Sequence, residues 1–236
     1  TLDDFVGQPH LVGKGSVLRK MIDSGRIPSI ILWGPPGVGK TTLANIISNV
    51  LEAPFYKLSA INSGVKDVRD VIEKAGSNRF FNSAAPILFI DEIHRFSKSQ
   101  QDSLLHAVET GTITLIGATT ENPSFEVIRP LLSRCQVYVL KSMETEDLVD
   151  LLERALTKDY ILREKDIEVK ETNALFRFAG GDARKLLNII DLVVEASVED
   201  KIVIDDQIVS ERLQENPAAY DKGGEMHYDI ISAFIK

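Results

Sequence analysis

The chain has 236 residues, 44% of them hydrophobic and 26% charged, so it can bury a substantial core in one large domain or in one medium and one small domain. Its formal net charge of -8 at pH 7 excludes a uniformly basic surface that coats nucleic acid, although a local basic stripe could still contact DNA. The single cysteine, Cys135, excludes an intrachain disulfide, and no apolar stretch is long enough for a membrane span.

Five short apolar runs alternate with helix-length segments in the first part of the chain. They have strand length and are rich in β-branched residues, and they occupy 29–33, 55–59, 86–91, 113–120 and 136–140. Strands that alternate with helices are typical of a parallel sheet that helices cover. We therefore expect the chain to begin with an α/β domain of this kind over residues 1–141.

Helical periodicity replaces the strand pattern in the next part of the chain. Its first helix is expected at 142–159, with Ser142 as N-cap, acidic residues in the first turns and leucines along one stripe. Two more helical stretches follow, and Gly180 is the expected C-cap of the first of them. Residues 142–212 are therefore expected to form a small all-α domain.

The last part of the chain, 213–236, contains Pro217, Gly223 and Gly224 and has the composition of a linker. The chain ends there within an apolar-patterned segment and begins without Met, so we expect an excerpt of a longer protein. Residues 213–236 are then a linker and the start of a truncated C-terminal unit. The first residues also lack the basic and apolar segments of a signal peptide, which favours a cytoplasmic protein.

The stretch ILWGPPGVGKTT, residues 31–42, places a glycine-rich loop between a predicted strand and a predicted helix. It fits the pattern G-x-x-x-x-G-K-[ST] in the strand-to-helix context that the pattern requires. Such glycines let backbone N–H groups turn toward phosphate oxygens, and the helix adds the positive end of its dipole. The alternative is a simple glycine turn. The predicted nucleotide-binding residues of the loop are Gly34, Pro35, Pro36, Gly37, Val38, Gly39, Lys40, Thr41 and Thr42.

Polar residues end two further predicted strands. Asp91 can hold Mg²⁺ or its water, and Glu92 is placed to polarise the attacking water in nucleotide hydrolysis. A solvated acidic turn is the alternative for this pair, and the phosphate loop favours the catalytic interpretation. Thr119 and Thr120 end another predicted strand, and either hydroxyl could donate to the γ-phosphate or to that water. The alternative is a threonine pair that caps the strand.

Phosphoryl transfer usually needs an arginine, and two arginines are candidates. Arg134 comes after the predicted strand 113–120, which ends in the two threonines. It is expected at the rim of the domain, where it could reach the nucleotide of a neighbouring subunit. Arg184 begins a helix of the small domain and could reach the phosphates of its own subunit. Both could instead be solvated residues at helix ends. Cys135 beside the first arginine is expected to be a packed hydrophobe rather than a nucleophile.

These features, in this order, resemble the AAA+ ATPases, which have an αβα domain followed by a helical lid. More narrowly, six segments are similar to the family of replication-associated recombination protein A, also called MgsA or RarA and related to the eukaryotic Werner-helicase-interacting ATPase. The segments are SGVKDVRDVI, FIDEIHRFSKSQQD, GTITLIGATTENPSF, LLSRCQVYVL, GDARKLLNI and YDKGGEMHYDIISAF. The similarity covers nearly the whole chain.

The resemblance implies a Mg²⁺-dependent, DNA-stimulated ATPase that acts at stalled replication forks in replication-associated recombination and DNA damage tolerance. It implies ATP as the nucleotide and DNA as a partner, at forks, gaps or junctions of single and double strands. Replication proteins such as single-stranded-DNA-binding protein are further implied partners, and copies of the full-length protein are expected to assemble through a C-terminal helical region. No membrane partner is implied, and the expected location is the cytoplasm, in association with the nucleoid.

The resemblance also assigns roles to single residues. The implied catalytic residues are Lys40, Glu92, Thr120 as sensor, Arg134 as the finger in trans, and Arg184 as the sensor of the lid. The implied metal ligands are Thr41 and Asp91. The implied contacts to adenine are Val6, Gly7 and Val12.

Two positions depart from the family pattern. Ser97 stands where the family usually has Asn, and the segment VIRPLLSR adds Arg129 near the presumed finger, so either Arg129 or Arg134 could be the finger. Other functions also stay open. A clamp-loader subunit or a branch-migration motor similar to RuvB is the alternative within the class, and a nucleotide-gated scaffold without turnover is the alternative outside it.

Overall fold

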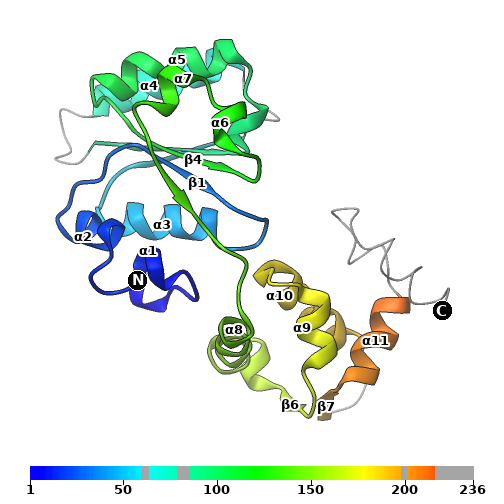
Figure 1. Ribbon diagram of the computed structural model, residues 1–236. Helices are drawn as coiled ribbons and strands as arrows, with labels where there is room; N and C mark the ends of the chain where they lie inside the picture. The colour runs from blue at the N-terminus through cyan, green and yellow to red at the C-terminus, as the bar shows by residue number, and fades with distance from the viewer. Residues whose placement is uncertain (60–63, 79–84, 198–200, 216–236) are drawn as a thin grey trace. The chain divides into compact units, whose positions relative to one another are not determined.

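The computed structural model describes residues 1–59, 64–78, 85–197 and 201–215. The chain separates into two compact units, one from Thr1 to Ser142 and one that begins at Met143 (Figure 1). Among the residues that the structure describes, no helix is both long enough and apolar enough to cross a membrane. The predicted linker and third unit lie outside the described residues from position 216 onward.

The first unit is built on a parallel sheet of five strands in the order β2-β3-β4-β1-β5. The strands are β1 (Ile30–Trp33), β2 (Phe55–Ser59), β3 (Ile87–Asp91), β4 (Thr114–Thr119) and β5 (Gln136–Val139). Each strand lies within one of the five apolar runs of the sequence, so the predicted α/β fold with a parallel sheet is confirmed. Strand β4 lies between β1 and β3 in this sheet.

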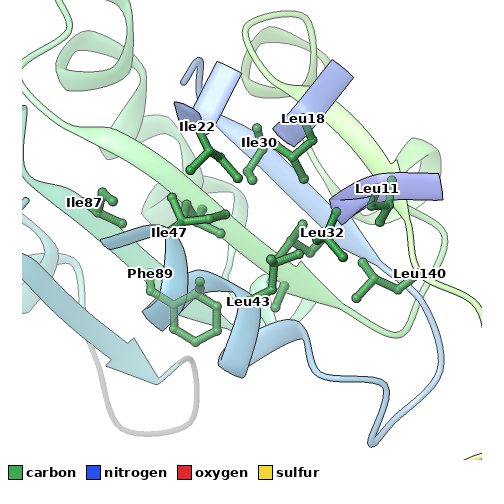
Figure 2. Packing of buried hydrophobic residues seen from close by; sticks show 14 of the residues in the cluster. Leu11, Leu18, Ile22, Ile30, Leu32, Leu43, Ile47, Ile87, Phe89 and Leu140 are labelled. Atoms are coloured by element: carbon green, nitrogen blue, oxygen red, sulfur yellow. The ribbon is translucent and has the colours of Figure 1, made fainter. Parts of the chain in front are cut away.

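Successive side chains of the strands enter two different hydrophobic clusters. Ile30 and Leu32 of β1 belong to one cluster, and Ile31 between them belongs to the other. This alternation follows from the two-residue repeat of a strand. Figure 2 shows the first cluster, in which Leu43 and Ile47 lie near the strand residues. The central strands β1, β3 and β4 are buried on both faces and read in the sequence as continuous apolar runs, whereas the edge strands β2 and β5 are partly exposed.

Helices cover both faces of the sheet (Figure 1). The first cluster is closed by α1 (Pro9–Val12), α2 (Val17–Asp23) and α3 (Lys40–Val50). The second is closed by α4 (Val65–Asn78), α5 (Lys98–Glu109) and α7 (Arg129–Leu132). The shorter elements of this unit are α6 (Pro123–Glu126) and the 3-10 turns η1 (Leu2–Asp4) and η2 (Ile93–Arg95).

The N-terminal segment bonds to the chain along and after the edge strand β5. The side chain of Gln8 is buried, donates from Nε2 to the carbonyl oxygen of Lys141 at 2.7 Å, and accepts the N–H of Lys141 at 2.9 Å. Nε2 of His10 lies 2.9 Å from the carbonyl oxygen of Val139. These side chains therefore satisfy backbone groups at an edge that would otherwise be open to pairing with another chain.

Gln101 of α5 holds the segment between α6 and α7. Only 1% of this residue is exposed. Its Nε2 donates to the carbonyl oxygens of Phe96 and Glu126, each at 3.1 Å, and its Oε1 accepts the N–H of Ile128 at 2.9 Å. One buried amide thus partners three backbone groups in a region without regular ladder hydrogen bonds.

The second unit is mainly helical and has its own hydrophobic cluster. Its helices are α8 (Thr145–Lys158), η3 (Leu162–Glu164), α9 (Asn173–Ala179), α10 (Ala183–Glu195) and α11 (Asp206–Glu215). Gly180 ends α9 with a φ of 56°, so the predicted C-cap is confirmed. Asp182 caps α10 by accepting the N–H groups of Arg184 at 2.8 Å and Lys185 at 3.1 Å.

Two details of this unit differ from the expectation. The N-cap of α8 is Glu144 rather than Ser142, because the N–H of Met143 donates to the carbonyl oxygen of Gly181 and the chain stays extended through Glu144. The expected all-α region also contains two short parallel strands, β6 (Asp166–Val169) and β7 (Lys201–Ile204). Runs of four residues are too short for periodicity to separate strand from helix.

The contacts of Gln101 predict a large effect on stability. We expect Gln101→Ala to lower the free energy of unfolding by about 1–3 kcal/mol, because buried backbone groups lose their partner. The exposed Gln136→Ala is the matched control, with an expected change below about 0.5 kcal/mol. Trp33 is the only tryptophan, so its fluorescence during urea unfolding reports on the first unit. Equal shifts of the two unfolding midpoints would contradict the role of Gln101.

Candidate active site

Three strand ends that carry predicted site residues are neighbours in the sheet. Strand β4 ends at Thr119, between the end of β1 at Trp33 and the end of β3 at Asp91. Trp33 pairs with Thr119 in the register, and the N–H of Gly34 donates to the carbonyl oxygen of Thr119 at 3.2 Å. Because the carboxyl ends of parallel strands share one edge, the phosphate loop, the carboxylates and the threonines meet there.

The phosphate loop requires glycine at both of its ends. A Cβ on Gly34 would collide with the carbonyl oxygen of Leu140, at the end of the neighbouring β5. Gly39 has a φ of 92° and forms the N-cap of α3, and a Cβ there would lie 2.7 Å from Cζ of Phe5. The aromatic ring of the N-terminal segment thus packs directly on the loop. The two glycines allow the close approach of backbone that a phosphate cradle needs.

Lys40 is the first residue of α3, and its side chain turns back toward the loop that precedes the helix. The residue is 8% exposed, and Nζ donates to the carbonyl oxygens of Gly34 and Pro35, each at 2.7 Å. A buried ammonium group needs such partners. The charge is therefore already held at the place where the loop would receive phosphate oxygens.

Glu92 follows β3 in a backbone conformation that is rare for a residue with a side chain. Its φ is 55°, in the left-handed region, where a non-glycine residue carries strain of about 1–2 kcal/mol. Its Oε2 lies 3.2 Å from Nε2 of His94 and 3.5 Å from Nε of Arg95. Strain of this kind is concentrated at functional sites, which supports a catalytic interpretation of Glu92.

The two threonines at the end of β4 have different surroundings. Thr119 is fully buried, and its Oγ1 accepts the N–H of Glu121 at 3.0 Å and lies 3.0 Å from Nδ1 of His94. Thr120 is partly exposed. The hydroxyl of Thr119 is engaged inside the protein, so Thr120 remains the predicted sensor.

The predicted finger residue Arg134 lies on the surface just after α7. Its guanidinium donates to the carbonyl oxygen of Pro130 at 2.7 Å and pairs with Glu109 of α5 at 3.2 Å. Arg129, the first residue of α7, is also exposed. Both arginines are thus on the surface, where a second copy could meet them. Arg184 belongs to the second unit, and its role as lid sensor stays a prediction.

The segment predicted to contact adenine lies beside the loop. Val6 and Gly7 are partly buried, and they follow Phe5, which packs on Gly39. Val12 is 5% exposed and belongs to the hydrophobic cluster below the sheet. The contacts of these residues with a base stay a prediction.

The residues at this edge of the sheet fit a triphosphate with Mg²⁺. The loop turns through positive φ at Gly37 and Gly39, 68° and 92°, and α3 begins at the loop with the positive end of its dipole. Thr41 and Asp91 are both partly exposed at this edge, and they offer the oxygen ligands that Mg²⁺ prefers. The arrangement can bind phosphates, hold a metal ion and present a carboxylate to water.

Reasoning from the sequence missed four residues of this neighbourhood. His94 contacts both Glu92 and Thr119, Phe5 packs on the loop, and Gln8 and Gln101 hold the segments beside it. For His94 a signal existed, since it follows the two carboxylates closely in the sequence. For the other three no local pattern distinguishes them from ordinary surface or core residues.

Two protein families match the chain. Residues 30–143 match the "ATPase family associated with various cellular activities (AAA)", and residues 163–236 match the "AAA C-terminal domain". The first match includes the phosphate loop, both carboxylates and the surface arginines of the first unit.

Curated relatives match along the whole chain. "Replication-associated recombination protein A" of Coxiella burnetii is 48% identical over an alignment of 240 positions, which covers 100% of this chain and 54% of the relative. The Escherichia coli K12 protein of that name is 44% identical over 241 residues, with the same coverage of 100% and 54%. "ATPase WRNIP1" of Dictyostelium discoideum is 41% identical, and the match covers 100% of this chain and 29% of that protein. The chain thus spans about half the length of the bacterial relatives it matches.

A solved structure is also similar in fold. The Thermotoga maritima RuvB Holliday junction branch migration motor has a TM-score of 0.72 and 26% sequence identity. The match covers 100% of this chain and 78% of that chain. The similarity extends over both units of the chain.

The packing of Phe5 on the loop predicts a specific sensitivity at Gly39. Gly39→Ala and Gly25→Ala both introduce a Cβ at positive φ, 92° and 76°, but only the first meets another residue. We expect Gly25→Ala to destabilise the chain by about 1–2 kcal/mol through strain alone. Gly39→Ala should destabilise it further and also weaken binding of a fluorescent ATP analogue. Identical stability and nucleotide affinity in the two variants would contradict the contact with Phe5.

Cys135 should be unreactive in the folded protein. Burial raises the pKa of its thiol from 9.0 to about 12, so the thiolate is scarce at pH 8. The chain has no other cysteine, so a chromogenic disulfide reagent titrates this thiol alone. We expect slow labelling of the native protein at pH 8 and rapid labelling in denaturant. Rapid labelling of the native protein would contradict the prediction that the Cys135 thiol is unreactive.

Proposed function

Because the chain belongs to the family of replication-associated recombination protein A within the AAA ATPases, we propose that it binds ATP with Mg²⁺ and hydrolyses it. One observation carries the proposal. The hydrogen bond from Gly34 to Thr119 joins the phosphate loop to β4, and β3 beside it ends in Asp91 and Glu92. Binding groups and hydrolytic groups are therefore parts of one rigid sheet edge.

The phosphate loop and α3 supply the binding groups. Backbone N–H groups from Gly37 to Thr42 and the ammonium of Lys40 bind the β- and γ-phosphates, which replace loop carbonyls as partners of Lys40. The hydroxyl of Thr41 and the carboxylate of Asp91 are the groups that would hold Mg²⁺ or its water. When bound, the ion neutralises phosphate charge. The segment with Val6, Gly7 and Val12 contacts the base.

Glu92 and the polar strand end carry out hydrolysis. The Glu92 carboxylate accepts a hydrogen bond from the attacking water and orients it toward the γ-phosphate. Thr120 donates to the γ-phosphate or to that water, and so senses its presence. Arg184, from the second unit, provides a further positive charge to the phosphates.

Arg134 acts as the finger on the nucleotide of a neighbouring copy. Its exposure suits this role, because a finger in trans must lie on the surface of its own subunit. The ion pair with Glu109 holds the guanidinium on the surface of the isolated chain and is exposed enough to exchange partners readily. Turnover therefore requires assembly of the full-length protein into a homo-oligomer.

The biological setting is proposed from the relatives. Their printed name associates them with replication and recombination, and DNA at forks, gaps or strand junctions is the corresponding partner. We propose that DNA stimulates ATP hydrolysis at stalled forks, in company with single-stranded-DNA-binding protein and in the cytoplasm near the nucleoid. The likeness to a Holliday junction motor favours branch migration as the second candidate function.

Single substitutions in the full-length protein test the ATPase. We expect Mg²⁺-dependent turnover that rises with forked DNA, and its loss by a factor of about 100 or more in Glu92→Gln. Arg134→Ala should lose a similar factor, whereas Arg129→Ala should retain most of the activity. Turnover in the presence of EDTA, or tight ATP binding without turnover in the wild type, would contradict the proposal.

Mixing the two inactive variants tests the action in trans. In a mixed oligomer, an Arg134→Ala subunit keeps Glu92 and can receive Arg134 from a Glu92→Gln neighbour. We therefore expect mixing to restore part of the wild-type turnover. Absence of any recovery, despite subunit exchange, would place the arginine in the site of its own subunit.

A further inference from the structure

His94 occupies the middle of η2, directly after the strand that carries the carboxylates. Its side chain is only 13% exposed, and both ring nitrogens have partners. Nε2 lies 3.2 Å from Oε2 of Glu92, and Nδ1 lies 3.0 Å from Oγ1 of Thr119. The ring thus bridges the end of β3 and the end of β4.

The chemistry of the two contacts assigns the donor on the ring. A carboxylate only accepts hydrogen bonds, so the Nε2–H of His94 donates to Glu92. The hydroxyl of Thr119 has one proton, which it can donate to Nδ1 of His94 or to the carbonyl oxygen of Glu121 at 3.2 Å. The donor to Glu92 is therefore Nε2–H of His94, whichever acceptor the hydroxyl of Thr119 takes.

Thr119 extends this contact to the phosphate loop. Its Oγ1 is also held by the N–H of Glu121 at 3.0 Å, and its carbonyl oxygen accepts the N–H of Gly34 at 3.2 Å. A continuous series of contacts thus runs from Gly34 through Thr119 and His94 to Glu92. Its members are buried or partly buried, where hydrogen bonds are stronger than in water.

The second partner of Glu92 is a weaker anchor. Nε of Arg95 lies 3.5 Å from the same Oε2, and 56% of the Arg95 side chain is exposed. Exposed ion pairs of this length contribute little. His94 is more buried than Arg95, and its ring also contacts the hydroxyl of Thr119 through Nδ1.

From this geometry we propose that His94 is a positioning residue for hydrolysis. It holds the Glu92 carboxylate in place and connects it to the phosphate loop through Thr119. The position of the carboxylate is thereby coupled to the position of the loop. The inference rests on the proposed ATPase function, because it assigns His94 a part in that reaction without contact to the nucleotide.

Substitutions at His94 in the full-length protein test this role. We expect His94→Ala to lower kcat between about 10-fold and 100-fold, because a misplaced carboxylate orients water poorly. The KM for ATP and the affinity for a fluorescent ATP analogue should change by less than about 2-fold. His94→Gln, whose amide can still donate to Glu92, should recover most of the lost rate. The exposed His106→Ala is the control and should match the wild type.

The link to Thr119 has its own readout. Thr119→Val removes the hydroxyl, and in combination with His94→Ala it should add little further loss, because both substitutions break the same connection. Fully multiplicative losses would overturn the connection. Equal loss of kcat and nucleotide affinity in His94→Ala, without recovery in His94→Gln, would overturn the positioning role. Wild-type turnover in His94→Ala would overturn the inference alone, whereas an inactive wild type would overturn the proposed function as well.

Discussion

Strand β4 lies between β1 and β3, and the main-chain hydrogen bond from Gly34 to Thr119 locks its end against the start of the phosphate loop. Every other relation in the site depends on this placement. A slip of one residue along β4 would turn Thr119 to the opposite face and carry its hydroxyl away from His94. The hydrophobic clusters on both faces oppose such a slip, because it would exchange their members. The register of β4 therefore determines both the packing of the core and the geometry of the site.

Sequence reasoning predicts the parts of the molecule that rest on local rules. The three central strands β1, β3 and β4 are recognisable because burial on both faces makes each a continuous apolar run, and the phosphate loop is recognisable because its glycines have fixed spacing. The side chains that hold the irregular segments follow no such rule. Gln8 bonds a residue 133 positions away, and Gln101 and His94 bond residues 25 positions away. Such contacts become visible only when the strand order is known. The small strands β6 and β7 escaped for a related reason, since their pairing joins segments far apart in the sequence.

Buried polar side chains share one task in the first unit. Gln8, Gln101 and Ser29 each bond backbone groups where a strand begins or where the chain runs without regular structure. A buried peptide group without a partner is costly, and loops cannot supply ladder partners. These residues therefore give hydrogen-bond partners to backbone groups that no ladder reaches. Among the described residues, no buried side-chain nitrogen or oxygen lacks a partner.

Gln8 also determines where the chain can turn between its two units. It holds the peptide groups on both sides of Lys141, so the plane that joins Lys141 to Ser142 is fixed to the first unit. The N–H of Met143 donates to Gly181, so the plane that joins Ser142 to Met143 is fixed to the second unit. The two planes meet at Cα of Ser142. The connection is therefore a joint with two degrees of freedom, the φ and ψ of one residue, and any swing that leaves these hydrogen bonds intact pivots on that single atom.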